Sequence, residues 1–175
     1  MPNRPEQTIA YRVYHDGNDL IGIATLEMPE IKYMTETLSG SGVAGEIENP
    51  TIGITESLSV KFSFTSVETK IFHTLDWTAS ALYECWAALQ VTDDATGQRV
   101  SLPFRVNMVG RTKAFPLGSL EQGKKHGNEL ELELTRLQIL LDGEAKLLID
   151  KLNFIHIVNG VDLLATVRSQ IGLNV

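Results

Sequence analysis

The sequence predicts a mainly β domain whose antiparallel sheets have one buried and one solvated face. The segment SLSVKFSFT, residues 57–65, alternates between polar and apolar side chains, and this period of two is typical of a half-buried strand. Asp-Gly pairs at 16–17 and 142–143 separate β-compatible runs and therefore predict hairpin turns. Hydrophobic residues make up 43% of the 175-residue chain, which suffices for one domain with a sizeable core.

Three hairpins are expected along the chain. The first joins residues 8–15 to 20–28 around Asp16-Gly17, and Pro29 ends its second strand. The second joins residues 81–91 to 100–109 through the turn DDATGQ. The third runs through ELELELTRLQILL, turns at Asp142-Gly143 and returns over residues 145–150. In its first strand, one face is apolar and the other acidic: Leu130, Leu132 and Leu134 against Glu129, Glu131 and Glu133.

Two helices are expected between and after these strands. Residues 67–75 carry an apolar stripe that suits a helix covering one opening of the sheet. A short terminal helix is expected to begin at Asp162 as its N-cap and to end at Gly172, with Leu164, Val167 and Ile171 as its apolar stripe. Chain ends fray unless they dock against something, so this helix predicts a docking partner.

One long segment does not follow the strand pattern. Residues 35–57, TETLSGSGVAGEIENPTIGITES, contain four glycines and few large apolar side chains. A structureless connection of this length is uncommon in a compact domain and is usually functional or mobile. Two interpretations remain open: a flexible surface loop, or an arm that becomes ordered against a neighbouring molecule.

Composition excludes several classes of protein. The net charge of −7 argues against an electrostatic binder of duplex DNA, which needs clustered Lys and Arg. No apolar run approaches 18 residues, and the N-terminal residues lack the pattern of a secretory signal, so we expect no membrane span and no leader. A single cysteine, Cys85, excludes an internal disulfide.

The residues give little evidence of catalysis. The four histidines show no metal-ligand spacing, and Gly40-Ser41-Gly42 lacks the Lys and the strand-to-helix context of a phosphate loop. Cys85 with His73 and Asp76 would make a nucleophile, a base and an orienting acid, but a cysteine in an alternating strand is more often a buried apolar residue. We therefore expect no catalytic residue, no metal and no cofactor, and a self-assembling building block suits the open sheets better.

Several short motifs then suggest a family. They run in order from Asp16-Gly17 through Met28-Pro29-Glu30-Ile31, the arm ETLSGSGVAG (36–45), Gly110-Arg111-Thr112-Lys113 and Asp142-Gly143 to the terminal VNGVD (158–162) with Leu164, Arg168 and Ile171-Gly172-Leu173. This order resembles, almost end to end, the major tail tube proteins of contractile-tailed phages, a family that includes the tubes of R-type bacteriocins. Ser39 stands where the arm of that family often has Arg, and Ala114-Phe115-Pro116 where an acid often follows the Lys.

The resemblance implies an antiparallel β-sandwich or half-barrel subunit with one flanking helix and a short C-terminal helix. It implies a single domain over residues 1–175, six copies closing into a ring whose inner sheets join as one β-barrel, and rings stacking into a tube inside a contractile sheath. The implied inter-ring arm, at about 35–57, includes Leu38, Ser39, Gly40, Gly42, Val43 and Gly45. The implied docking motif at the C-terminus includes Asn159, Gly160, Val161, Asp162, Arg168 and Ile171.

The resemblance also implies partners and a place of action. These are the chain itself, a sheath protein, a baseplate or tube initiator, a tape measure and a tail terminator, in a virion tail assembled in the host bacterial cytoplasm. DNA would pass through the lumen without specific binding. The polar side chains Ser57, Ser59, Lys61 and Ser63 are the candidates for lining that lumen.

Two other hypotheses remain. A type VI-like secretion tube would share the fold and carry effector proteins in place of DNA. A small-ligand-binding or enzymatic β-barrel would be monomeric and would enclose an apolar pocket.

Overall fold

The computed structural model describes residues 3–20, 23–66, 69–76 and 78–173, and it is almost entirely β. Twelve strands, one 3-10 helix and one α-helix are assigned over these residues. The elements are β1 (Asn3–His15), β2 (Asn18–Leu20), β3 (Ile23–Glu27), β4 (Tyr33–Leu38), β5 (Ile47–Thr55), β6 (Ser59–Phe64), η1 (Thr69–Leu75), β7 (Ala81–Asp93), β8 (Arg99–Ala114), β9 (Asn128–Leu141), β10 (Glu144–Asp150), β11 (Ile155–Val158), β12 (Val161–Asp162) and α1 (Ala165–Gln170).

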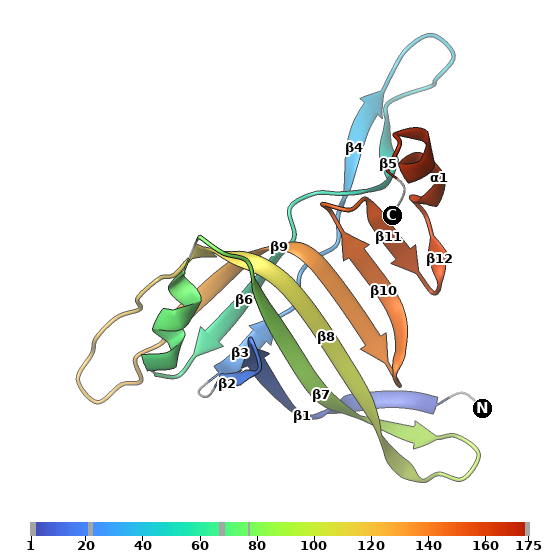
Figure 1. The fold of residues 1–175 in the computed structure, drawn as a ribbon. Coiled ribbons are helices and arrows are strands. Elements are labelled where there is room, and N and C mark those ends of the chain that lie inside the picture. The colour runs from blue at the N-terminus through green and yellow to red at the C-terminus, as the bar shows by residue number, and fades with distance from the viewer. Residues whose placement is uncertain (1–2, 21–22, 67–68, 77, 174–175) are drawn as a thin grey trace.

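The main sheet is antiparallel and branches at β9. Its long path runs β12-β11-β10-β9-β8-β7-β1-β2. β6 pairs with residues 128–133 of β9, whereas β10 pairs with residues 136–141, and β3 adds to the far side of β6. The sheet therefore curves around its own apolar face as a half-barrel, while the separate hairpin β4–β5 projects from it (Figure 1). The expected mainly β, half-barrel class is confirmed.

An irregularity in β9 makes this branch possible. The pairing with β8 shifts between Val109 opposite Arg136 and Gly110 opposite Leu134, so Thr135 is the extra residue. Buried residues are even-numbered before it and odd-numbered after it, which keeps the apolar side of β9 on the core through the bend. Gly110 is required there, because a Cβ would lie 2.5 Å from the carbonyl oxygen of Glu133.

The core lies on the concave side of the half-barrel. Its fully buried members include Leu58, which precedes β6, and side chains of β6, β7, β8 and β9: Val60, Phe62, Tyr83, Val106, Met108, Leu130, Leu132 and Leu134. Val13 of β1 and Ile71 of η1 also belong to it. The alternation expected for SLSVKFSFT is confirmed, and so is that of the leucine–glutamate strand, because Leu130, Leu132 and Leu134 are buried while Glu129 is exposed. Burial of this apolar face is the main source of stability in such a sheet.

The second and third expected hairpins are confirmed, and the first is only partly right. β7 with β8 and β9 with β10 pair as expected, and Asp142 and Gly143 adopt φ of 53° and 78° in the tight turn. β1 begins at Asn3 rather than at residue 8, and the return run is divided. β2 pairs with β1, but β3 pairs with β6 and so satisfies the backbone edge of β6 that β9 leaves free.

The two helices differ from expectation. Residues 69–75 form a 3-10 helix, in which Ile71 is buried and Phe72 is half exposed, and residues 67 and 68 lie outside the described residues. The C-terminal α-helix begins at Ala165, three residues after the expected N-cap, because Asp162 pairs in β12 instead. Gly172, with φ of 78°, follows the end of this helix as expected.

Candidate assembly surfaces

The glycine-rich segment is a projecting β-hairpin, so the expectation of a stretch without strands was wrong. β4 and β5 pair antiparallel, with Leu38 opposite Ile47, and the turn between them holds Ser39, Gly40, Gly42, Val43 and Gly45. The three glycines have φ of 150°, 107° and 129°, which residues with a side chain rarely adopt. The amide of Val43 donates to the carbonyl of Gly40 at 3.1 Å and closes the turn. We call β4, the turn and β5 the arm.

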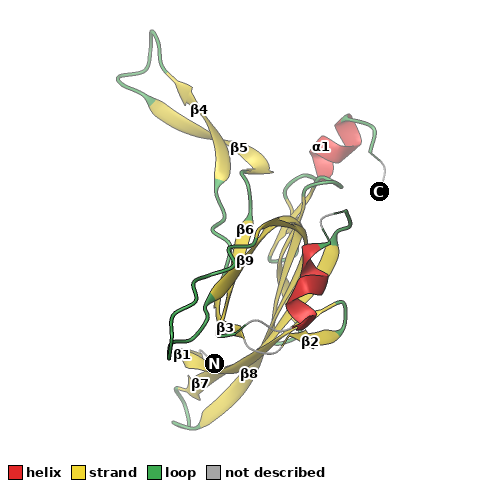
Figure 2. Ribbon diagram, turned by 90° about the vertical axis from the view of Figure 1, so that its left-hand side faces the viewer, coloured by secondary structure: helices red, strands yellow, loops and turns green. Residues whose placement is uncertain are grey.

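The arm stands away from the half-barrel in both views (Figures 1 and 2). Every residue of β4 is exposed, as are the apolar side chains Leu38, Val43, Ile47 and Ile52. An isolated two-stranded hairpin is marginally stable in water, and exposed apolar side chains on it favour contact with another molecule. The arm is therefore the first candidate assembly surface.

The root of the arm is fastened to β11. The fully buried imidazole of His156 donates through Nδ1 to the carbonyl of Gly53 at 3.0 Å, and its Nε2 lies 3.4 Å from the hydroxyl of Tyr33. The rings of Tyr33 and His156 are stacked with centroids 5.6 Å apart. One side chain thus touches both strands of the arm, since Tyr33 begins β4 and Gly53 belongs to β5.

Leu164 completes this attachment. A Cβ built on Gly53 would lie 2.7 Å from Cγ of Leu164, so the leucine packs directly on the glycine backbone. Leu164 is buried, and Lys151 adds a hydrogen bond from Nζ to the carbonyl of Glu56 at 2.8 Å. The C-terminal segment therefore packs against the root of the arm, which is the docking partner that was expected for the end of the chain.

The C-terminal docking motif forms a small structure of its own. Asn159 and Gly160, with φ of 49° and 81°, make the turn between β11 and β12, and Val161 is exposed. Asp162 accepts from the amide of Leu164 at 3.0 Å and from Nη2 of Arg168 at 2.6 Å. Arg168 also donates to the carbonyl of Phe154 at 2.9 Å, while Ile171 stays exposed. The hydrogen bond from Arg168 lowers the pKa of Asp162.

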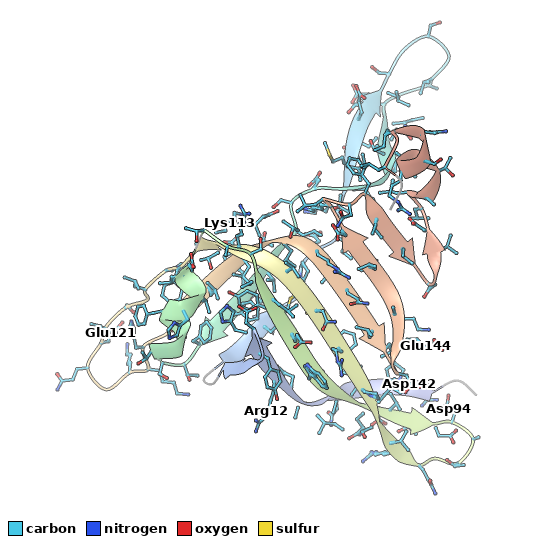
Figure 3. The ribbon with its side chains drawn as sticks, viewed as in Figure 1. Arg12, Asp94, Lys113, Glu121, Asp142 and Glu144 are labelled. Carbon is cyan, nitrogen blue, oxygen red and sulfur yellow. The ribbon has the colours of Figure 1, made fainter. Side chains whose placement is uncertain are left out.

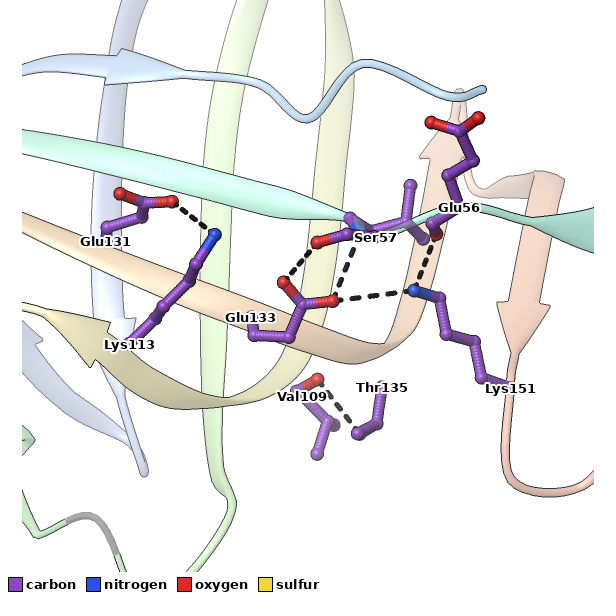
Figure 4. A network of polar contacts seen from close by, with 9 residues as sticks. Glu56, Ser57, Val109, Lys113, Glu131, Glu133, Thr135 and Lys151 are labelled. Atoms are coloured by element: carbon purple, nitrogen blue, oxygen red, sulfur yellow. Dashed lines mark hydrogen bonds and ion pairs between the residues drawn. The ribbon is translucent and has the colours of Figure 1, made fainter. Parts of the chain in front are cut away.

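The four candidate lumen residues lie beside the acidic side of β9. Ser59, Lys61 and Ser63 are paired with Glu133, Glu131 and Glu129, and Ser57 donates to Glu133 at 2.5 Å. Lys113 bonds Glu131 at 3.0 Å, and Lys151 lies 3.6 Å from Glu133 (Figure 4). The hydrogen bond from Lys113 lowers the pKa of Glu131, which favours the ionised form of that carboxyl group.

No catalytic arrangement forms around the cysteine. Cys85 is buried in the core, and burial raises the pKa of its thiol to about 11, which keeps it protonated and unreactive at neutral pH. His73 and Asp76 instead line a small recess with His15, Thr74 and Tyr83. Among the described residues there is no cluster of His, Cys, Asp and Glu able to hold a metal. The helices that could be searched include none with the length and apolarity needed to cross a membrane.

The root of the arm holds a small, largely apolar recess. It has a volume of about 210 Å³ and is lined by Gly53, Ile54, Thr55, Ile149, Asp150, Lys151, Phe154, Ile155 and Leu164. Sites for small ligands usually measure roughly 300–1,000 Å³. The geometry therefore favours surfaces for assembly over a site for a small molecule.

Sequence reasoning missed the residues of the arm root. Tyr33, Gly53 and His156 lie far apart in the chain and belong to no motif. The signal in the sequence was a histidine between two isoleucines, Ile155-His156-Ile157, which indicates a buried imidazole that needs polar partners.

Comparison with known proteins agrees with this geometry. A family model described as phage tail tube protein FII matches residues 5–172. The tail tube protein of Escherichia phage P2 is 26% identical, with 97% of this chain and 98% of that protein aligned. Two components of an extracellular contractile injection system, PVC, have a similar fold. For its sheath/tube terminator the TM-score is 0.53, with 15% identity over 78% of this chain and 96% of that one. For a chain of its sheath-tube complex it is 0.51, with 15% identity over 74% and 87%.

Proposed function

Because the chain belongs to the phage tail tube protein FII family and is a structural tail tube subunit rather than an enzyme, we propose that six copies close into a ring and that such rings stack into a hollow tube. The observation that carries the proposal is the alignment with a phage tail tube protein over nearly the whole of both chains. The likeness extends through the arm and the C-terminal segment, since the family match ends at residue 172.

Open strand edges support ring closure. Residues 3–12 of β1 pair with β7 alone among the described strands, and β3 pairs only with β6. Unpaired edges of this kind are templates for pairing with another chain. A closed ring of identical subunits satisfies every such edge, which an open dimer does not. The inner sheets of six subunits would then join as one continuous β-barrel.

The arm and the C-terminal motif have distinct roles in this proposal. The arm turn, with Leu38, Ser39, Gly40, Gly42, Val43 and Gly45, contacts the adjacent ring. The C-terminal motif, with Asn159, Gly160, Val161, Asp162, Arg168 and Ile171, holds the root of the arm within its own subunit. Truncation after Asn159 would remove Leu164 and Arg168 and is expected to prevent assembly.

The lumen conducts DNA without binding it. We place Ser57, Ser59, Lys61 and Ser63 on the lumen wall, beside the carboxylates of Glu129, Glu131 and Glu133. Lys113 and Lys151 are paired with Glu131 and Glu133, and the net charge of −7 repels phosphates. A secretion tube would have the same architecture with protein cargo, and the P2 relative favours the phage tail.

The remaining partners follow from a contractile tail. The tube lies inside a sheath, begins on a baseplate or initiator, is measured by a tape measure protein and ends at a terminator. The protein is a component of a virion or a phage-like particle, and we propose that it assembles in the host bacterial cytoplasm.

Electron microscopy of the purified full-length chain tests the proposal. Negative-stain images at high concentration, with and without baseplates as seeds, should contain six-fold rings or hollow tubes. Particles that remain single subunits even on baseplate seeds would overturn it. Nuclease-protected DNA in particles that contain the tube would separate a DNA conduit from a protein conduit.

A further inference from the structure

The arm has an unusual charge. Between Lys32 and Lys61 the chain contains four glutamates, Glu36, Glu46, Glu48 and Glu56, and no Lys, Arg, His or Asp. The arm also exposes apolar side chains, and Ile52 has 72% of its surface accessible. A surface that receives the arm must therefore combine positive charge with apolar area.

One surface on the same chain has this combination. Arg12, Trp86 and Arg105 lie side by side on β1, β7 and β8, as paired residues on the side of the sheet opposite the core residues Val13, Cys85 and Val106. Tyr14 meets the edge of Trp86 with centroids 6.4 Å apart. We call Arg12, Tyr14, Trp86 and Arg105 the receiving patch.

Trp86 and Arg105 form the centre of the receiving patch. Trp86 has 45% of its surface accessible, which is unusual for a large aromatic residue in the middle of a sheet. The guanidinium carbon of Arg105 lies 3.3 Å from the centroid of the Trp86 ring. Stacking fixes the plane of the guanidinium and leaves its N–H groups at the edge, where they suit a carboxylate. Nothing in the described part of the chain hydrogen-bonds or ion-pairs with Arg105. The acid on the same face of β7 is Glu84, which lies opposite Tyr14 and Asn107 in the sheet.

The strands that carry the receiving patch lie away from the arm. The arm is at the top of Figure 1, and β1, β7 and β8 lie below it. Arg12 projects from the lower part of the molecule in Figure 3. A protrusion and a complementary surface at separate places on one subunit produce head-to-tail contacts that continue from copy to copy.

We propose that the arm of one subunit docks on the receiving patch of a second copy of this chain in the adjacent ring. Glu46 of the arm pairs with Arg105, and the apolar arm side chains cover Trp86. Trp, Tyr and Arg are the residue types that most often carry the binding energy of an interface. The inference rests on the proposed function and adds the surface that receives the arm.

A charge exchange in the full-length chain tests this contact. Trp86→Ala, Arg105→Glu and Glu46→Lys should each raise the concentration needed for tube growth on baseplate seeds about tenfold or more. Combining Arg105→Glu with Glu46→Lys should recover most of that loss, because the opposite charges meet again. Arg111→Glu is the matched control, since Arg111 lies on the same strand and bonds Ser80 outside the patch, and it should grow normally.

The outcomes separate this inference from the proposed function. Wild-type chain that forms no rings or tubes on seeds would overturn the function itself. If folded Trp86→Ala and Arg105→Glu variants grow like wild type, the patch does not receive the arm. Trp86 and Arg105 would then face the lumen or the sheath, and only this inference would be overturned. Failure of the charge exchange to restore growth, with thermal unfolding unchanged, would also overturn it.

Discussion

The imidazole of His156 is stacked on the phenol ring of Tyr33, with the two planes 12° apart, although 123 residues separate them in the chain. The stack joins the first residue of the arm to the C-terminal part of the sheet. A projecting hairpin can reach a neighbouring molecule reproducibly only if its root is held, and this contact holds it.

Replacing His156 by Ala should loosen the arm. The change leaves the carbonyl of Gly53 without its buried donor, which costs about 1–3 kcal/mol in the free energy of unfolding. Denaturant unfolding measures the loss, and Glu-specific proteolysis of the arm should accelerate. His126→Ala is the control, because His126 also bonds a backbone carbonyl, that of Leu117, but in an exposed loop. Equal proteolysis of the arm in both variants would contradict the role of His156.

Gly53 and Leu164 should be energetically coupled. Gly53→Ala combines a left-handed backbone, φ of 67°, with a clash against Leu164, and should cost about 2–4 kcal/mol. Gly143→Ala has a similar φ of 78° and nothing within 4 Å, so it measures the backbone cost alone. In a Leu164→Ala background the cost of Gly53→Ala should fall to that of Gly143→Ala. A double-mutant cycle with no coupling would mean that the leucine does not hold the arm.

The glycines of the arm turn should matter more for stacking than for folding. Gly42→Val and Gly45→Val force a β-branched residue into φ of 107° and 129°, yet no other atom lies within 4 Å of either position. Subunits should remain folded by circular dichroism, while seeded tubes should be shorter or absent. Gly123→Val, in another exposed turn with φ of 79°, provides the control. Normal tubes from the Gly42 and Gly45 variants would exclude the arm from stacking.

Acid should weaken the contact between Asp162 and Arg168 in the C-terminal segment. The pKa of Asp162 is lowered in the folded chain, chiefly by the hydrogen bond from Arg168. In an unfolded chain the pKa of Asp is about 3.9. Its contribution to stability is therefore fully present above the unfolded pKa and is lost as pH falls through the lower, folded pKa. Wild type should exceed Asp162→Asn in unfolding free energy at pH 7, and the difference should shrink below about pH 4. Glu144→Gln, on an exposed ion pair with Lys146, should change this profile little; a gap between wild type and Asp162→Asn that did not depend on pH would contradict the assignment.

Much of the fold was predictable because a strand with one buried face alternates apolar and polar residues in the sequence. Leu58, Val60, Phe62 and Phe64 gave the β6 alternation directly, and Asp142-Gly143 gave its turn. The arm strands were not predictable in this way. Every side chain of β4 is exposed in the free subunit, so no alternation distinguishes a strand from a loop there.

Some residues of the candidate surfaces could also be predicted from the sequence, and others could not. The glycines of the arm and the terminal Asn-Gly-Val-Asp could be singled out from the chain alone, because positive φ and turns require particular residue types. The stack of Tyr33 on His156 and the row Arg12, Trp86, Arg105 could not, since each depends on the register of strands distant in sequence. Asp162 is not the helix cap that the sequence predicted, because its backbone pairs with β11 and its carboxylate accepts from Arg168 and from the amide of Leu164.

A single arm at one end of the subunit has a consequence for any filament built by repeating it. Such a filament is polar: if rings stack through the arm as proposed, one terminus displays unoccupied arms, acidic and partly apolar, and the other displays vacant receiving surfaces. The two termini cannot be capped by the same protein, and growth at each proceeds with its own rate constant. The factor that starts the filament and the factor that stops it must therefore imitate opposite halves of the same contact.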